Sequence, residues 1–253
     1  MAKVTGVVLA AGASQRMGVP KLLLQYRDAT VLDATIAAVE ASAVDRVIVV
    51  TGARAEAVEA SLEMRISSST LGGGAAAGGE GGQERRRLPA TSFQSPVASR
   101  QPEGPSLSNA GSGMDPKSRD SKTPIIVLRN PDYRRGNMSS LLTATTDDRE
   151  AEAFIVVPGD LPTVRTDVID SVIELWINGA PWAAVTAYRD RIAHPILLSS
   201  TAAESMEEMT GEKVLGRILI ETDDDRVVRL SVPFEAPQDV NTPEDYEALL
   251  AES

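Results

Sequence analysis

The feature that most constrains the fold lies near the start of the chain, where an apolar strand runs into a loop of small residues. The run Val4–Ala10 is rich in β-branched side chains and has the length of a buried strand in a parallel sheet. The loop Ala11–Ser14 follows, with Gly12 at the point where the backbone must turn. Its main-chain N–H groups can face phosphate oxygens, and Arg16 and Lys21 add positive charge. The pattern predicts a loop for an anionic ligand, while a tight strand-to-helix turn with solvated charges would have the same appearance.

The rest of the chain alternates strands with helices. Strands are predicted at 46–51, 125–129, 154–157, 182–187, 195–198 and 227–232. Helices are predicted at 31–41, 55–64, 139–146, 167–178 and 213–221. A last helix should begin after Thr242 as N-cap, with Pro243 in its first turn and Asp245 three residues after the cap. This order predicts an α/β three-layer fold with a mainly parallel sheet, in one domain spanning 1–253.

Residues 67–123 differ from everything around them. They contain runs of glycine and arginine with scattered Ser, Pro and Gln, and Phe93 is their only aromatic residue. A segment with so few large apolar side chains cannot offset the entropy lost on ordering, so we predict a disordered insertion that interrupts the domain. A tolerated surface loop is the simplest interpretation, and a tether or partner-binding segment that uses Arg85–Arg87 is the alternative.

Composition excludes several classes of function. The formal net charge is -11, which argues against a broad basic surface for nucleic acid, so anionic substrates need a local cationic site. The chain has no cysteine, which excludes disulfides, thiolate zinc sites and thiol nucleophiles. No apolar run approaches the ~20 residues that span a bilayer, and no export signal is recognisable, so we expect a cytoplasmic protein that does not contact membranes.

Two acidic residues are candidates for a metal site. Asp160 follows a predicted buried strand in Gly159–Pro162, and Asp239 precedes the last helix. Mg²⁺ usually takes one or two carboxylates together with phosphate oxygens and water, which this pair could supply at the carboxyl edge of the sheet. Asp160 could instead stabilise a turn, and Asp239 could simply lead into the helix cap, with Asn241 as the alternative ligand.

The first loop matches neither the three-glycine dinucleotide pattern nor the Walker phosphate loop. Its pattern Leu9-Ala10-Ala11-Gly12-x-Ser14-x-Arg16-Met17-Gly18-x-Pro20-Lys21 resembles the signature of the MobA-like nucleotidyltransferases. That resemblance implies a Rossmann-like nucleotide-diphospho-sugar transferase fold, and it makes Arg16 and Lys21 the catalytic cations. It also implies a nucleotide site built from Leu9, Ala10, Ala11, Gly12, Ser14, Arg16 and Lys21, and a metal-binding Asp160 from the family's Gly-Asp-x-Pro motif.

Three further stretches resemble the acceptor side of this family. The first two, Asn130–Tyr133 and Arg135–Leu141, imply acceptor contacts from Ser139 and Ser140, although each serine could equally serve as an ordinary turn or cap residue. Ala193–Leu197 implies a substrate contact from His194, with alanine in place of the family's glycine. A lone histidine is more often structural, and a substrate phosphate that is already a nucleophile needs no base.

The resemblance predicts transfer of a nucleoside monophosphate to a phosphorylated acceptor with Mg²⁺ as cofactor. Ala11 favours CTP over GTP, and molybdopterin is the expected acceptor, with transient contact to a molybdoenzyme. Thr210–Val214 departs from the family's Gly-Asp-x-Gly segment, which weakens the acceptor assignment. The alternatives are a sugar-phosphate or isoprenoid-precursor acceptor, an NAD(P)H-dependent oxidoreductase on the same scaffold, and a non-catalytic molybdoenzyme chaperone.

Overall fold

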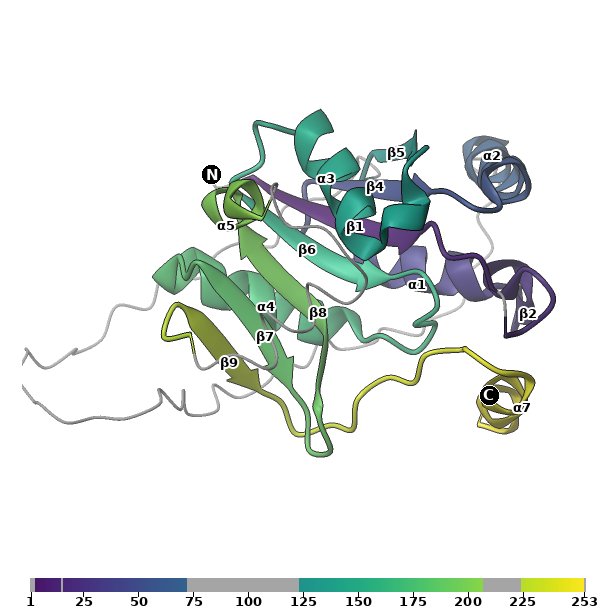
Figure 1. Ribbon diagram of the computed structural model, residues 1–253. Coiled ribbons are helices and arrows are strands. Elements are labelled where there is room, and N and C mark those ends of the chain that lie inside the picture. Colours follow the sequence, from purple (N-terminus) through teal and green to yellow (C-terminus); the bar gives the residue numbers. More distant parts are fainter. Residues whose placement is uncertain (1–2, 15, 72–122, 207–223, 253) are drawn as a thin grey trace, which may run out of the picture.

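The computed structural model describes residues 3–14, 16–71, 123–206 and 224–252. A seven-stranded sheet in the order β5-β4-β1-β6-β8-β7-β9 forms the centre, with helices on both faces (Figure 1). Its strands are β1 (Val4–Ala10), β4 (Arg46–Thr51), β5 (Ile125–Arg129), β6 (Ala153–Pro158), β7 (Ala183–Ala187), β8 (Ile192–Ser199) and β9 (Val227–Ser231). The predicted α/β three-layer fold is therefore confirmed.

The sheet is mainly parallel, and β8 is the exception. β1 pairs in parallel with β4 and β6, β4 with β5, and β7 with β9, whereas β8 runs antiparallel to both β6 and β7. The carboxyl ends of β1, β4, β5 and β6 therefore meet at one edge of the sheet, where open α/β sheets bind their ligands. We call this edge the carboxyl edge, and the opposite one the amino edge.

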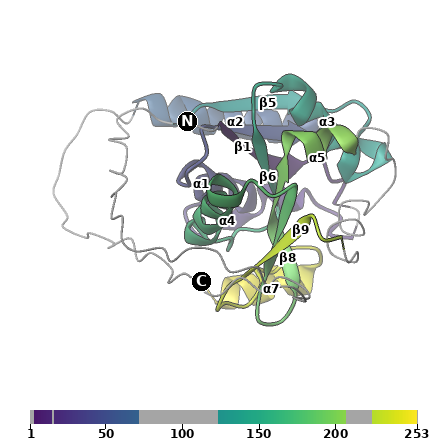
Figure 2. The same cartoon turned by 90° about the vertical axis from the view of Figure 1, so that its left-hand side faces the viewer.

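Among the described residues, helices pack on both faces of the sheet. α1 (Val31–Glu40), α2 (Ala55–Leu71) and α4 (Thr166–Gly179) pack on one face, and α3 (Asn137–Asp147) and α5 (Ser200–Ser205) pack on the other. Figure 2 shows α1 and α4 on one side of the sheet and α3 and α5 on the other. Within the described residues, no helix has the length and apolar character needed to cross a membrane.

β1 shows why its sequence is a continuous apolar run. Val4 and Val8 are buried in the core beneath α1 and α4, while Val7 is buried in the core beneath α3 and α5. A central parallel strand covered on both faces buries both sets of side chains, so the alternation seen in half-exposed strands is absent. Its one polar side chain, Thr5, is buried and donates to Asp148.

A third, smaller apolar cluster fixes the last helix. α7 (Pro243–Ala251) packs next to the hairpin of β2 (Gln25–Tyr26) and β3 (Ala29–Thr30) (Figure 1). The helix and the hairpin are far apart in the sequence. The buried members of this cluster are Met17, Tyr26, Val31, Val240 and Leu249. The hydroxyl of Tyr246 also donates to the carbonyl of Gln25 at 2.6 Å. The C-terminal segment is therefore attached to the region that carries the first loop.

The predicted elements agree with the described ones apart from a few details. α2 continues to Leu71, so residues 67–71 are helical where disorder was predicted, and the other residues of the predicted insertion within 72–122 lie outside the described residues. The predicted helix 213–221 also lies outside them. The prediction missed α5 and the β2–β3 hairpin, which are too short for a periodic pattern to identify.

Candidate active site

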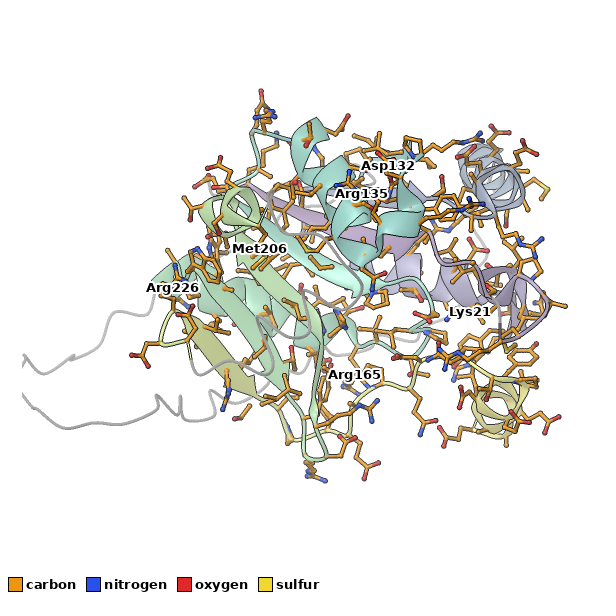
Figure 3. The ribbon with its side chains drawn as sticks, viewed as in Figure 1. Lys21, Asp132, Arg135, Arg165, Met206 and Arg226 are labelled. Atoms are coloured by element: carbon orange, nitrogen blue, oxygen red, sulfur yellow. The ribbon has the colours of Figure 1, made fainter. Side chains whose placement is uncertain are left out.

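The loop after β1 leaves its backbone open to a ligand. A Cβ atom added at Gly12 would meet nothing within 4 Å, and the residue is exposed. Ser14 has a positive φ of 52°, and its carbonyl accepts a bond from the Met17 N–H at 3.2 Å, which turns the chain. The Ser14 hydroxyl accepts from the Lys21 N–H at 3.3 Å, at the start of the short 3-10 helix η1 (Lys21–Leu23). The loop therefore places the Lys21 side chain at the carboxyl edge (Figure 3).

Two neighbouring strand ends brace this loop. The N–H of Gly159, after β6, donates to the carbonyl of Leu9 at 2.9 Å. The N–H of Ala53, after β4, donates to the carbonyl of Ala11 at 3.2 Å. A Cβ added at Gly52 would lie 2.7 Å from the Cβ of Ala11 and 2.7 Å from that of Tyr133. Position 52 therefore requires glycine for this close approach, and no recognised sequence motif pointed to it.

The main polar cluster joins three distant segments. Lys21 Nζ donates to Asp160 Oδ2 and, at 2.9 Å, to Asn241 Oδ1. Arg16 donates from its guanidinium to the same Asn241 Oδ1 at 3.1 Å. The Lys21 and Asp160 side chains are only 13% and 14% exposed, so their ion pair is largely shielded from water. The structure therefore brings together Arg16, Lys21, Asp160 and the alternative ligand Asn241.

The segment before α7 carries the second predicted carboxylate. The N–H of Val240 donates to the carbonyl of Asp160 at 3.1 Å, which joins this segment to the end of β6. Asp239 keeps surface exposed to solvent, yet its partial enclosure and then the Asp160 carboxylate raise its pKa above the usual range. Lys21 and Arg191 act on the pKa in the opposite direction. The two carboxylates therefore repel each other, as at a site that takes a cation.

His194 lies within electrostatic reach of the same cluster. Enclosure by protein lowers the pKa of its ring to about 4, and the Asp160 carboxylate acts in the opposite direction. The carbonyl of His194 accepts a bond from the Tyr188 hydroxyl at 2.9 Å. The imidazole is therefore neutral near pH 7, able to form hydrogen bonds but not to supply positive charge.

Ser139 and Ser140 lie at the start of α3, after β5, and their hydroxyls hold the local turn. Asn130 Nδ2 donates to Ser139 Oγ at 2.9 Å and to Ser140 Oγ at 3.0 Å. Ser139 Oγ in turn donates to the carbonyl of Gly136 at 2.8 Å, and Ser140 is 2% exposed. An acceptor contact from these hydroxyls stays a prediction, because the described contacts are internal to the turn.

The donor set of the cluster fits a hard divalent cation. Asp160 and Asp239 offer carboxylate oxygens and Asn241 an amide oxygen, which are ligands that Mg²⁺ and Mn²⁺ prefer. No group of three or more His, Cys, Asp or Glu residues that could hold a metal occurs in the described parts of the chain. A small number of protein ligands suits an ion whose remaining ligands are phosphate oxygens and water.

The cluster places cationic side chains and oxygen ligands beside an open loop, an arrangement suited to a phosphorylated ligand, and comparisons with known proteins identify the family. The model of the MobA-like NTP transferase domain matches residues 6–83 and 110–227. The chain therefore belongs to the MobA-like NTP transferase family, and it is a nucleotidyltransferase. The matched residues end before Asp239 and Asn241. A comparison with curated proteins finds no significant match.

Solved structures of similar fold are nucleotidyltransferases or members of this family. Rv0371c from Mycobacterium tuberculosis is 26% identical, with a TM-score of 0.67 and coverage of 100% of this chain and 98% of that one. A manganese complex of Rv0371c matches at 24% identity and a TM-score of 0.64, covering 99% of this chain and 100% of that one.

Two more distant structures support the fold alone. A nucleotidyl transferase from Methanothermobacter is 21% identical, with a TM-score of 0.62 and 99% coverage of both chains. A cytidylyltransferase from Leptospira borgpetersenii is 13% identical, with a TM-score of 0.60, covering 99% of this chain and 86% of that one. The predicted Rossmann-like nucleotide-sugar transferase fold is therefore confirmed.

Proposed function

We propose that this nucleotidyltransferase uses Mg²⁺ to transfer CMP from CTP to molybdopterin or a related molybdenum cofactor precursor, with release of pyrophosphate. The observation that carries the proposal is the cluster in which Arg16 and Lys21 meet Asp160 and Asn241 beside the open loop. Such a cluster offers positive charge for a triphosphate and oxygen ligands for a metal in one place.

Nucleotide binding is assigned to the first loop. The backbone of Leu9, Ala10, Ala11, Gly12 and Ser14 faces the nucleotide, and Gly12 leaves space for it. The preference for CTP rests on the resemblance at Ala11, and the similar fold of a cytidylyltransferase is consistent with it.

Catalysis in this proposal is mostly positioning and electrostatics. A phosphate oxygen of the acceptor attacks the α-phosphorus of CTP, the bond from that phosphorus to the bridging oxygen breaks, and pyrophosphate leaves with the electron pair. Arg16 and Lys21 neutralise the negative charge on the triphosphate and the leaving pyrophosphate. Asp160 and Asp239, with Asn241 as an alternative to the latter, hold Mg²⁺, which when bound polarises phosphate oxygens.

The acceptor side is assigned to His194, Ser139 and Ser140. The neutral ring of His194 near Asp160 can hydrogen-bond a polar acceptor, and it has no role as a base because the attacking phosphate is already anionic. After transfer, the product would reach a molybdoenzyme through transient contact.

The test is pyrophosphate release measured with each of the four nucleoside triphosphates. Each is combined with Mg²⁺ or Mn²⁺ and with molybdopterin, a sugar phosphate or an isoprenoid-precursor phosphate. We expect turnover with CTP and molybdopterin, and its loss in Lys21→Ala and Asp160→Ala with the circular dichroism spectrum unchanged. Lys3→Ala is the matched control, because Lys3 pairs with Asp148 at the amino edge.

Other results would replace the proposal by a named alternative. Turnover only with another phosphate changes the acceptor, and NADPH consumption without pyrophosphate release indicates an oxidoreductase. Nucleotide binding without any turnover indicates a chaperone. Parental rates in both site variants would contradict the assigned roles.

A further inference from the structure

The ammonium of Lys21 donates to the same two oxygen atoms that the proposed function assigns to the metal ion. Its Nζ donates to Asp160 Oδ2 and to Asn241 Oδ1, and both atoms belong to candidate metal ligands. We propose that Lys21 is a latch that holds these oxygens in the nucleotide-free protein and releases them only when a triphosphate supplies a competing anion. This inference rests on the proposed function, because it takes Asp160 as a ligand of a divalent cation.

Burial strengthens the repulsion between Lys21 and a divalent cation that approaches Asp160. Lys21 and Asp160 are 13% and 14% exposed, so water screens their charges only weakly. A divalent cation that approached Asp160 while the ammonium stayed in place would meet a positive charge within hydrogen-bond distance of the same carboxylate. The folded protein without nucleotide should therefore bind a divalent cation poorly, although oxygen ligands are present.

A triphosphate changes this balance because it offers Lys21 a new anionic partner. Phosphate oxygens accept strong charge-assisted hydrogen bonds from an ammonium, so Lys21 can turn to them and leave Asp160. Asn241 Oδ1 also accepts from Arg16, an exposed side chain that can make the same exchange. After both have turned, the Asp160 carboxylate and the Asn241 amide oxygen are available beside Asp239.

The consequence is positive coupling between nucleotide and divalent cation. Each ligand removes the obstacle to the other, and by linkage each must raise the affinity of the other by the same factor. Lys21 then has two successive partners, Asp160 before the triphosphate binds and the phosphates afterwards. The first partner balances the charge of Lys21 in the absence of substrate.

The test measures Mn²⁺ binding to the nucleotide-free protein by electron paramagnetic resonance of free Mn²⁺. Lys21→Met removes the charge with little change in side-chain length, and we expect it to tighten Mn²⁺ binding by about tenfold or more relative to the parent protein. Lys21→Gln keeps a donor group without the charge and should act in the same direction, so it serves where Lys21→Met does not fold. Lys3→Met removes the ammonium paired with Asp148 at the amino edge and should leave Mn²⁺ affinity unchanged.

Asp160→Asn, made in the parent protein and again together with Lys21→Met, separates the two ideas, because the parent protein should bind Mn²⁺ only weakly. Mn²⁺ binding lost in Asp160→Asn but not tightened in Lys21→Met or Lys21→Gln would overturn the latch and leave the proposed metal site standing. Mn²⁺ binding unchanged in Asp160→Asn would overturn the metal role of Asp160, and the latch with it. Tightening in the Lys21 variants together with loss in Asp160→Asn supports both.

Discussion

Two lysine–aspartate pairs lie at opposite edges of the sheet, and they differ in how completely the aspartate is satisfied. At the amino edge, Asp148 is 2% exposed and accepts from the Thr5 hydroxyl at 2.6 Å, with Lys3 Nζ at 3.4 Å and Arg46 Nε at 3.5 Å. At the carboxyl edge, Lys21 is the one side chain among the described residues that donates to the Asp160 carboxylate.

The difference separates an aspartate with protein donors on both oxygens from one whose carboxylate depends on a single lysine. Both oxygens of Asp148 have donors from the protein, since Lys3 approaches Oδ1 while Thr5 and Arg46 approach Oδ2. No ligand could improve on that arrangement without breaking it. Lys21 instead donates to both Asp160 and Asn241, and Asp160 lies near a second carboxylate, Asp239, whose pKa it helps to raise. A divalent cation held by Asp160 and Asp239, as proposed, would relieve the repulsion between the two carboxylates.

Replacing each aspartate by asparagine should give the largest contrast. Asp160→Asn should lower kcat by about 10²-fold or more, because a preorganised charged group is lost, with little change in the free energy of unfolding. Asp148→Asn should leave kcat near the parental value and lower the free energy of unfolding by about 2 kcal/mol, since charge-assisted hydrogen bonds to a buried group are lost. Pyrophosphate release and urea unfolding measure the two effects. Equal losses of kcat in both variants would show that the two edges do not differ in this way.

Alanine substitutions at Gly52, beside the first loop, and at Gly6, in the core, extend the comparison to the backbone. In Gly52→Ala, the new methyl would lie 2.7 Å from the Cβ of Ala11, so the loop must shift, and we expect KM for the nucleotide to rise about tenfold. In Gly6→Ala, the methyl would lie 2.5 Å from Val39 Cγ1 between β1 and α1, which should cost about 1–3 kcal/mol of stability through overpacking. KM of Gly6→Ala should stay near the parental value. Initial rates and thermal unfolding of both variants check this contrast, and an unchanged KM in Gly52→Ala contradicts it.

Two helix caps give the smallest expected effect. Thr242 caps α7 beside Asn241, and Ser199 caps α5 at the amino edge. Either residue replaced by alanine should lower the free energy of unfolding by about 1 kcal/mol. Only Thr242→Ala should also reduce kcat/KM, by less than about tenfold, because its helix start positions Asn241. A matching loss of kcat/KM in Ser199→Ala would show that the effect is general destabilisation.

Local patterns predicted much of the fold. β1, β4 and β5 have the predicted bounds, and Thr242 caps α7 through a capping box with Asp245, as the spacing of the two residues indicated. The antiparallel direction of β8 was not predicted, because its apolar residues would fit either direction and the choice depends on the neighbouring strands. The hairpin and α5 were also missed, since elements of two to six residues have no clear periodicity.

The sequence named the candidate residues, whereas the contacts between them came from the structure. Arg16, Lys21, Asp160 and Asn241 all stand out in the sequence, yet nothing there says that Lys21 contacts Asp160 and Asn241. Gly52 and the link from Tyr246 to Gln25 had no signal at all, because close approach and packing between distant segments leave no local pattern.

The sequence by itself determined the strand, the open loop, the helix starts and the kinds of side chain at the site, because each depends on residues only a few positions apart. Only the tertiary structure decided which aspartate receives donors on both oxygens and which depends on a single lysine. Asp148 and Asp160 are the same residue type, and each is paired with a lysine more than a hundred positions earlier in the chain. They differ because the fold gives Asp148 donors on both oxygens at the amino edge and gives the Asp160 carboxylate a single lysine donor at the carboxyl edge.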